Sequence, residues 1–139
     1  MSSGIYNVWK KKLMDAALNL GSDTLKIILL NNSHSFSASA AGYANVSANE
    51  LATAGGYTQN TKTLGSVTVT QDDGNNKAVF DAADTSWTSA TFTCYHAVIF
   101  DDTATGDPLI CSIDFGGAHQ VTAGTFSIQW SSSGIINIT

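Results

Sequence analysis

Histidine is the side chain best suited to general acid–base catalysis, and the chain has three, at His34, His96 and His119. His96 lies in the middle of an alternating apolar segment, where a hydrogen-bonded core or interface histidine is more common than a base. His34 and His119 lie in polar segments, and we expect their side chains to be solvated. The three are far apart in the sequence, so their spacing predicts no catalytic base.

The carboxylates offer two other kinds of chemistry, calcium binding and glycoside hydrolysis. Asp101, Asp102 and Asp107 border one predicted hairpin loop and could converge on Ca²⁺, although their spacing matches no known calcium loop. A glycosidase needs two carboxyl groups facing each other across a cleft. Three further aspartates lie at predicted strand ends, in positions that do not require such a pair: Asp81, Asp84 and Asp114. Asp72-Asp73 and Asp101-Asp102 suit turns, where aspartate bonds the backbone.

Sequence motifs of common active sites do not occur in the chain. It contains no G-x-S-x-G, H-E-x-x-H, G-x-x-x-x-G-K-[ST] or G-x-G-x-x-G pattern, and its two cysteines do not form a metal-ligand pair. We therefore predict a protein that is not an enzyme and that holds no cofactor or metal ion.

Cys94 and Cys111 lie in one predicted hairpin. A symmetrical loop would place Ile99 opposite Ile110 and Val98 opposite Cys111. Cys94 would then lie on the same face as Cys111 but roughly 13 Å away, at about 3.3 Å per residue. Because a disulfide needs Cα atoms within about 7 Å, this register predicts two free, buried thiols.

The chain has 139 residues, a net charge of −5 and only 12% charged residues, where about 25% is usual. Two explanations fit this low charged fraction. The solvent-exposed faces of the strands carry Ser and Thr, or the surface is covered by neighbouring proteins. An acidic chain without arginine is a poor nucleic-acid binder. The one basic cluster, Lys10 to Lys12, is typical of the solvent-exposed face of a helix.

The apolar runs are too short for a membrane span or a signal peptide, so we expect the chain to fold in a cytoplasm.

Apolar residues at helical spacing predict one helix, from about residue 4 to 20, ending before Gly21. The stripe comprises Ile5, Trp9, Leu13, Ala16, Ala17 and Leu20. The next segment, 24–31, predicts a strand, and its nearly continuous apolar run indicates that both faces are covered.

The segment from about 32 to 65 has little periodicity. Either it contains short strands that the pattern does not reveal, or it is an extended arm that a partner orders, and we favour the arm. Ser47 and Glu50 resemble a capping box, which predicts one helical turn. Phe36, Tyr43 and Tyr57 are its spaced aromatic residues, and we expect them to contact the partner.

From residue 66 onwards the pattern is β. SVTVT alternates, with Val67 and Val69 inward, and KAVFDA, TFTCYHAVIF, PLICSIDF, TFSIQW and IINIT follow as strands. The segments ADTSWTS and GAHQVTAG are expected to connect them. The turn spacing predicts a single domain over 1–139: a mainly β, antiparallel sandwich or jelly-roll-like fold with one N-terminal α-helix.

Several fragments together resemble a family of small virion structural proteins of tailed bacteriophages, and the resemblance covers nearly the whole chain. The fragments are an I-Y-N-x-W-K-like N-terminal helix, SDTLKIILL (22–30), GYT…KTL (56–64), VFDAxDTSW (79–87), YHAVIFDDT (95–103), PLICSIDFGG (108–117) and GTFSIQWSSSGII (124–136).

The resemblance implies a capsid cement or decoration protein that binds and stabilises the shell of major capsid protein. It implies a homotrimer on the capsid surface of the virion, assembled in the cytoplasm of a bacterial host. The alternative is a receptor- or glycan-binding module of a tail or head fibre, in which Trp87 and exposed tyrosines would stack on sugar rings.

Overall fold

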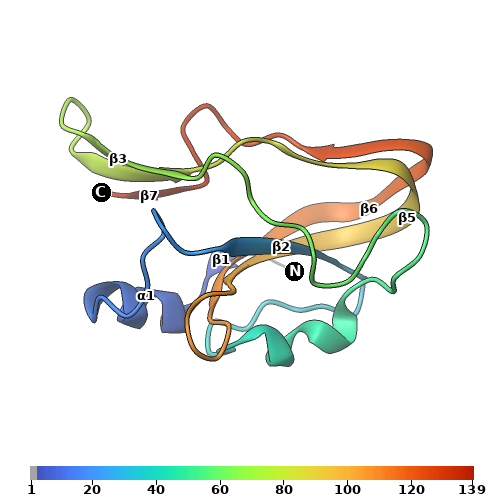
Figure 1. Ribbon diagram of the computed structural model, residues 1–139, viewed down its shortest axis with the longest axis horizontal. Helices are drawn as coiled ribbons and strands as arrows, with labels where there is room; N and C mark the ends of the chain where they lie inside the picture. The colour runs from blue at the N-terminus through green and yellow to red at the C-terminus, as the bar shows by residue number, and fades with distance from the viewer. Residues whose placement is uncertain (1–2) are drawn as a thin grey trace.

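The computed structural model describes residues 3–139, which form two antiparallel sheets and one α-helix (Figure 1). One sheet has the strand order β1-β6-β5-β2 and the other β3-β4-β7. The elements are β1 (Gly4–Ile5), α1 (Asn7–Met14), β2 (Leu25–Leu30), the 3₁₀ turns Tyr43–Asn45 and Ser47–Asn49, β3 (Thr68–Asp72), β4 (Lys77–Asp81), β5 (Thr85–Asp101), β6 (Leu109–Ile128) and β7 (Ile136–Ile138). The mainly β, antiparallel prediction is confirmed, whereas these strand orders do not confirm a jelly roll.

Strands β5 and β6 form a long hairpin of 17 and 20 residues that bends from the lower layer into the upper one (Figure 1). The segments ADTSWTS and GAHQVTAG lie largely within these two strands, so the prediction that they are connections is wrong. Bulges interrupt the pairing, and Ser89, Gly116, Gly117 and Ala123 have positive φ there. Each bulge shifts the alternation of side chains, which is why the sequence pattern broke at these points.

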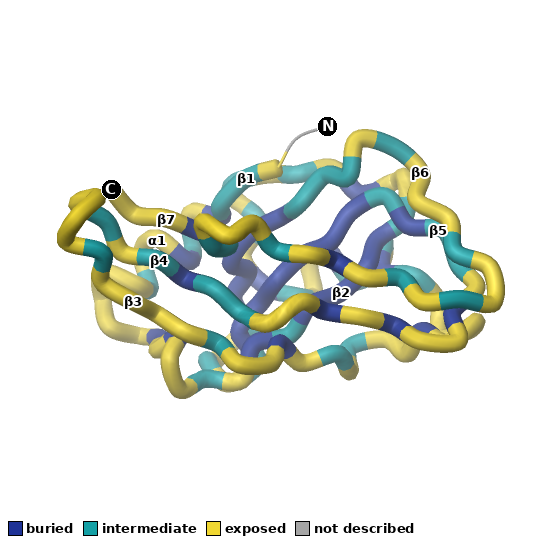
Figure 2. The backbone as a smooth tube through the Cα atoms, turned by 90° about the horizontal axis from the view of Figure 1, so that it is seen from above, coloured by how far each residue is buried: buried dark blue, intermediate teal, exposed yellow. Residues whose placement is uncertain are grey.

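Strand β2 is covered on both faces, as its apolar run predicts. Ile27, Ile28, Leu29 and Leu30 are all fully buried. Ile27 and Leu29 belong to the main core between the layers, and Ile28 and Leu30 to a second cluster on the outer face of the sheet. Figure 2 shows this burial concentrated in the middle of the molecule, along β2, β5 and β6. The prediction that Val69 points into the core is wrong, because the core ends before it reaches this residue of β3, which is 52% exposed.

The segment 32–65 folds on its own chain, so the prediction of an arm ordered by a partner is wrong. Its first part covers the outer face of the four-stranded sheet, with Val46 in the second cluster. Its later part closes the free edge of β2: Leu51 N–H donates to Leu29, and Leu64 N–H to Leu25. These bonds form short bridges rather than a continuous strand, which explains the missing periodicity. The helical turn predicted at Ser47 is confirmed as the 3₁₀ turn Ser47–Asn49, but the predicted capping box is wrong, because Val46 is the N-cap residue and Glu50 follows the turn.

Helix α1 is shorter than predicted, because Ile5 lies in β1 and the helix ends at Met14. Ala16 has φ 54°, and the N–H of Ala17 donates to the carbonyl of Lys12 while that of Ala16 donates to Leu13. This is a Schellman cap, in which glycine is the usual left-handed residue. Because alanine is also common inside helices, Ala16 does not mark the end of the helix in the sequence. Within residues 3–139 no helix has the length and apolarity that a membrane span requires.

The predicted free, buried state of Cys94 and Cys111 is confirmed, although the register differs by one residue. Cys111 pairs with Ile99 and Ser112 with Val98, next to an irregularity between Ile99 and Phe100. Cys94 instead lies opposite His119. Burial raises the pKa of both thiols to about 12.

Candidate binding groove

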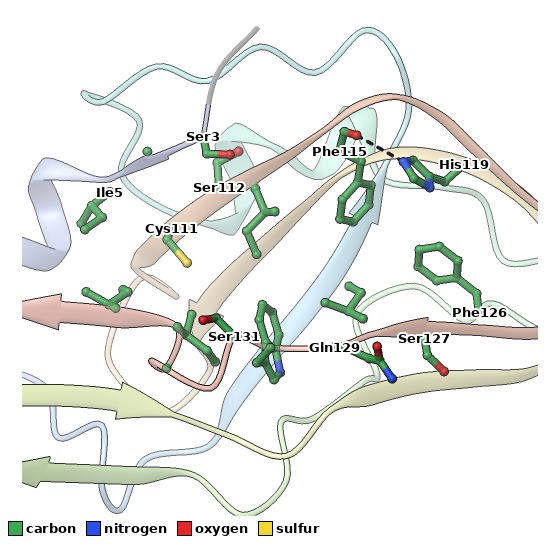
Figure 3. Close-up of a pocket in the computed structure, with 17 residues that line it drawn as sticks. Ser3, Ile5, Cys111, Ser112, Phe115, His119, Phe126, Ser127, Gln129 and Ser131 are labelled. Carbon is green, nitrogen blue, oxygen red and sulfur yellow. Dashed lines mark hydrogen bonds between the residues drawn. The ribbon is translucent and has the colours of Figure 1, made fainter.

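A groove of about 640 Å³ opens between the two layers, on the side where β1 and β6 form the sheet edge. Figure 3 shows side chains of β1 and of the first half of β6, among them Ile5 and Phe115, on one side of it, and Ser127 at the end of β6 with Gln129 and Ser131 on the other. Its apolar lining consists mainly of Ile5, Ile113, Phe115, Phe126, Trp130 and Ile135. These six side chains are half-buried and pack against the main core.

The groove is open because residues of segment 32–65 cover only one of the two long sides of the molecule. On the β2 side, Leu51, Tyr57 and Leu64 close the gap between the layers. On the β6 side, the only strand paired to the outer edge within residues 3–139 is β1, through Gly4 with Ser112 and Ile5 with Cys111. Beyond these two pairs, the outer edge of β6 has no partner strand among residues 3–139, and its residues Ile113, Phe115 and His119 line the groove.

The walls of the groove are held in place by the core and by hydrogen bonds. Phe126 stands 6.1 Å from Phe115 and 5.6 Å from Phe92, between ring centroids, and Phe92 in turn contacts Tyr57. On the other wall, the indole N–H of Trp130 donates to the carbonyl of Ala83 at 3.1 Å. The aromatic surface is therefore largely organised before anything binds, which lowers the entropic cost of binding.

The rim of the groove is polar but uncharged. It carries hydroxyl and amide groups and one imidazole: Ser3, Ser127, Gln129, Ser131 and His119. His119 is exposed, as predicted, although it lies in β6 rather than in a loop, and its Nε2 donates to the carbonyl of Phe115 at 3.2 Å. No Lys, Arg, Asp or Glu is among the lining residues. The arrangement suits a neutral, largely apolar ligand or protein segment rather than an ion.

The other two histidines lie on the opposite face of the sheet, under segment 32–65. His34 is 3% exposed, so the prediction that it is solvated is wrong, and its Nε2 lies 3.0 Å from Ser112 Oγ. Its ring packs edge-on against His96, 4.9 Å away. Burial, with the neighbouring His96, lowers the pKa of His34 to about 4, and burial also lowers that of His96. Both imidazole rings are buried, and neither of them lines the groove.

The aromatic residues predicted as partner contacts pack inside their own chain. Phe36 lies 5.0 Å from Tyr6, and Tyr43 stacks on Phe100 at 5.1 Å. Tyr57 is 2% exposed. Trp87, which the glycan-binding alternative needed on the surface, is 3% exposed, with Lys62 over its ring. None of the four lines the groove.

The aspartates of the β5–β6 loop serve the backbone and a salt bridge. Asp101 Oδ1 accepts the N–H groups of Thr103 and Ala104, and Asp102 pairs with Lys26 at 3.1 Å. Among the residues that the structure describes, no group of three or more His, Cys, Asp or Glu side chains is placed to hold a metal ion.

The sequence did not single out the groove residues as a site. It predicted strands over PLICSIDF and TFSIQW, which contain Ile113, Phe115, Phe126 and Trp130, although β6 ends at Ile128. Their meeting depends on the bend of the long hairpin, for which the sequence offered only scattered glycines. Comparisons with protein-family models, curated proteins and solved structures found no match to this chain.

Proposed function

We propose that this chain is a virion structural protein of a tailed bacteriophage, a capsid cement or decoration protein that binds major capsid protein through the groove between its two sheets. The observation that carries the proposal is the uncharged, preorganised aromatic surface of that groove, set beside an open strand edge. Buried aromatic anchors supply most of the binding energy at protein interfaces. The resemblance of the sequence to small phage virion proteins supports the capsid as the partner.

The partner segment that fits is neutral and apolar, and it runs along β6. Its side chains would enter between Phe115 and Ile135 while its backbone bonds to the open edge, as in strand addition. Each copy buries only a modest area in this way. Association of copies, the homotrimer that the resemblance implies, would multiply the strength of attachment to a repeating shell.

A charged side chain in the groove is expected to weaken binding. Ile135→Asp places a carboxylate where the partner covers an apolar surface, so we expect at least a tenfold loss of affinity for phage shells, corresponding to about 1.4 kcal/mol. The measurement is co-sedimentation of purified protein with shells stripped of decoration protein.

The matched control is Thr122→Asp, which adds the same charge at an exposed position of β6 that does not line the groove. Thermal melting of both variants confirms that they fold. Equal binding of the two variants, or no binding of the unchanged protein, would count against the proposal.

A further inference from the structure

The outer face of the sheet β1-β6-β5-β2 carries two buried imidazole rings that the proposed function does not use. His96 comes from β5, and His34 comes from segment 33–41, which lies over it. Both side chains are at most 3% exposed, and their ring centroids are 4.9 Å apart. His34 Nε2 also lies 3.0 Å from the hydroxyl of Ser112 in β6. The two histidines therefore join the covering segment to the sheet.

One positive charge on the histidine pair has a partner, whereas a second has none among the described residues. The carboxylate of Asp114 in β6 acts on both rings, with its Oδ1 3.9 Å from His96 Nδ1. Two further ionisable groups adjoin Ser112, the hydroxyl of Tyr6 and the thiol of Cys111, and their pKa values of about 12 keep both neutral below pH 8. Two buried imidazolium rings at this separation would repel each other.

The two histidines make the closed form less able to bind protons than an open form. Burial, and then the neighbouring His96, lowers the pKa of His34 to about 4, and burial lowers the pKa of His96. A solvated histidine has a pKa of about 6.5. Because the folded-state pKa values lie below this value, the stability that the pair gives to the closed form is complete above about pH 7. It is lost as the pH falls from about 6.5 to about 4.

Segment 33–41 can separate from the sheet without disturbing the main core. Phe36 and Ala40 pack against the second apolar cluster, and no residue of the segment belongs to the main core. Phe36 lies 5.0 Å from Tyr6 between ring centroids, and the carbonyl of Ala38 accepts an N–H group of α1. Loss of these contacts is a local opening rather than unfolding of the whole chain.

We propose that the His34–His96 pair makes the cover of this sheet sensitive to acid. At neutral pH the pair holds segment 33–41 closed, and protonation of both rings opens the segment and exposes the second apolar cluster around Ile28 and Val98. This opening is independent of capsid binding, and it is measured on the purified chain alone.

Hydrogen exchange of individual amides, measured by NMR at pH 7.5 and pH 5.0, tests the proposal after correction for the intrinsic pH dependence of exchange. The reporters are the hydrogen-bonded N–H groups of His34, Ala40 and Asn7. We expect their protection to fall at least tenfold at pH 5.0, because a pKa of about 4 against about 6.5 favours the open form about 30-fold at that pH. The protection of β4 should change less than twofold.

Three substitutions distinguish this titration from a general effect of acid. His34→Gln can still bond to Ser112 but takes up no proton, so it should remove most of the acid effect. Asp114→Asn removes the carboxylate that favours protonation of the closed form, so it should enlarge the effect, while its amide oxygen can still accept the N–H of Gly116. His119→Gln is the same substitution at the exposed histidine and should leave the acid effect unchanged.

Unchanged protection of the three reporters at pH 5.0, an equal fall of protection in β4, or the full acid effect in folded His34→Gln overturns the proposal. If His34→Gln does not fold, an acid effect in Asp114→Asn no larger than that of the unchanged chain overturns it instead.

Discussion

Replacing Glu50 with alanine is expected to lower the free energy of unfolding by about 3–5 kcal/mol. Glu50 is 5% exposed and accepts three hydrogen bonds: from the hydroxyl of Tyr43 at 2.6 Å, the hydroxyl of Tyr57 at 2.8 Å and the N–H of Asn60 at 2.8 Å. Tyr57 in turn accepts the N–H of Leu29 in β2 at 3.0 Å. The variant leaves three donors without their acceptor and loosens the segment that closes one side of the core.

Urea denaturation of the Glu50→Ala variant measures this loss. Tyr43→Phe is the graded comparison, since it removes only one of the three bonds and should cost about 1 kcal/mol. A loss below 1 kcal/mol for Glu50→Ala would show that the tyrosines and Asn60 find other acceptors, and that this network does not hold segment 32–65 in place.

Replacing Asp101 with asparagine is expected to stabilise the fold at pH 8 by about 2–3 kcal/mol, and not at pH 4. Burial, and then the adjacent Asp23, raises the pKa of Asp101 to about 6. The folded-state pKa lies above the unfolded value, so the stability contributed by this group is complete below pH 4 and is lost as the pH rises through 6. Asparagine imitates the protonated acid at every pH.

The structure accommodates this change, because the amide oxygen can still accept the N–H groups of Thr103 and Ala104, as Oδ1 does now. The amide nitrogen takes the place of Oδ2 beside Asp23, whose carboxylate can accept the amide N–H. Unfolding curves at pH 4, 6 and 8 provide the measurement. Asp102→Asn is the control, and it should gain nothing because it breaks the pair with Lys26. Equal effects of Asp101→Asn at pH 4 and pH 8 would refute the assigned titration.

Local pattern sufficed for elements whose burial is uniform along the chain. The continuous apolar run of β2 correctly indicated a strand covered on both faces, and the alternation around Val98 and Ile113 correctly indicated strands. The pattern failed where tertiary contacts decide the structure. Segment 32–65 lacks periodicity because it bonds to β2 in short bridges, and α1 ends at a left-handed Ala16 that resembles any helical alanine. His34 lies in a polar stretch, but the sheet beneath it supplies a buried partner, Ser112.

The candidate site shows the same difference between what local pattern predicts and what tertiary contacts decide. The alternation of apolar residues predicts the strand segments that line the groove. No local pattern in the sequence shows that β5 and β6 bend together and leave one long side of the molecule open. The aromatic residues of segment 32–65 were expected to contact a partner because the segment was taken for an arm. In the structure that segment closes the β2 side and Tyr57 lies in the core. The surface that we propose for a partner lies on the opposite side, at Phe115 and Phe126.

The most direct test of the central proposal is cryo-electron microscopy of the phage particles that carry this chain, with its copies located and counted. The proposal predicts copies on the capsid shell, in numbers set by its lattice, with the groove between β6 and the C-terminal segment covered by major capsid protein. A few copies at the tail tip or on fibres, or copies on the shell whose groove faces solvent, would contradict it.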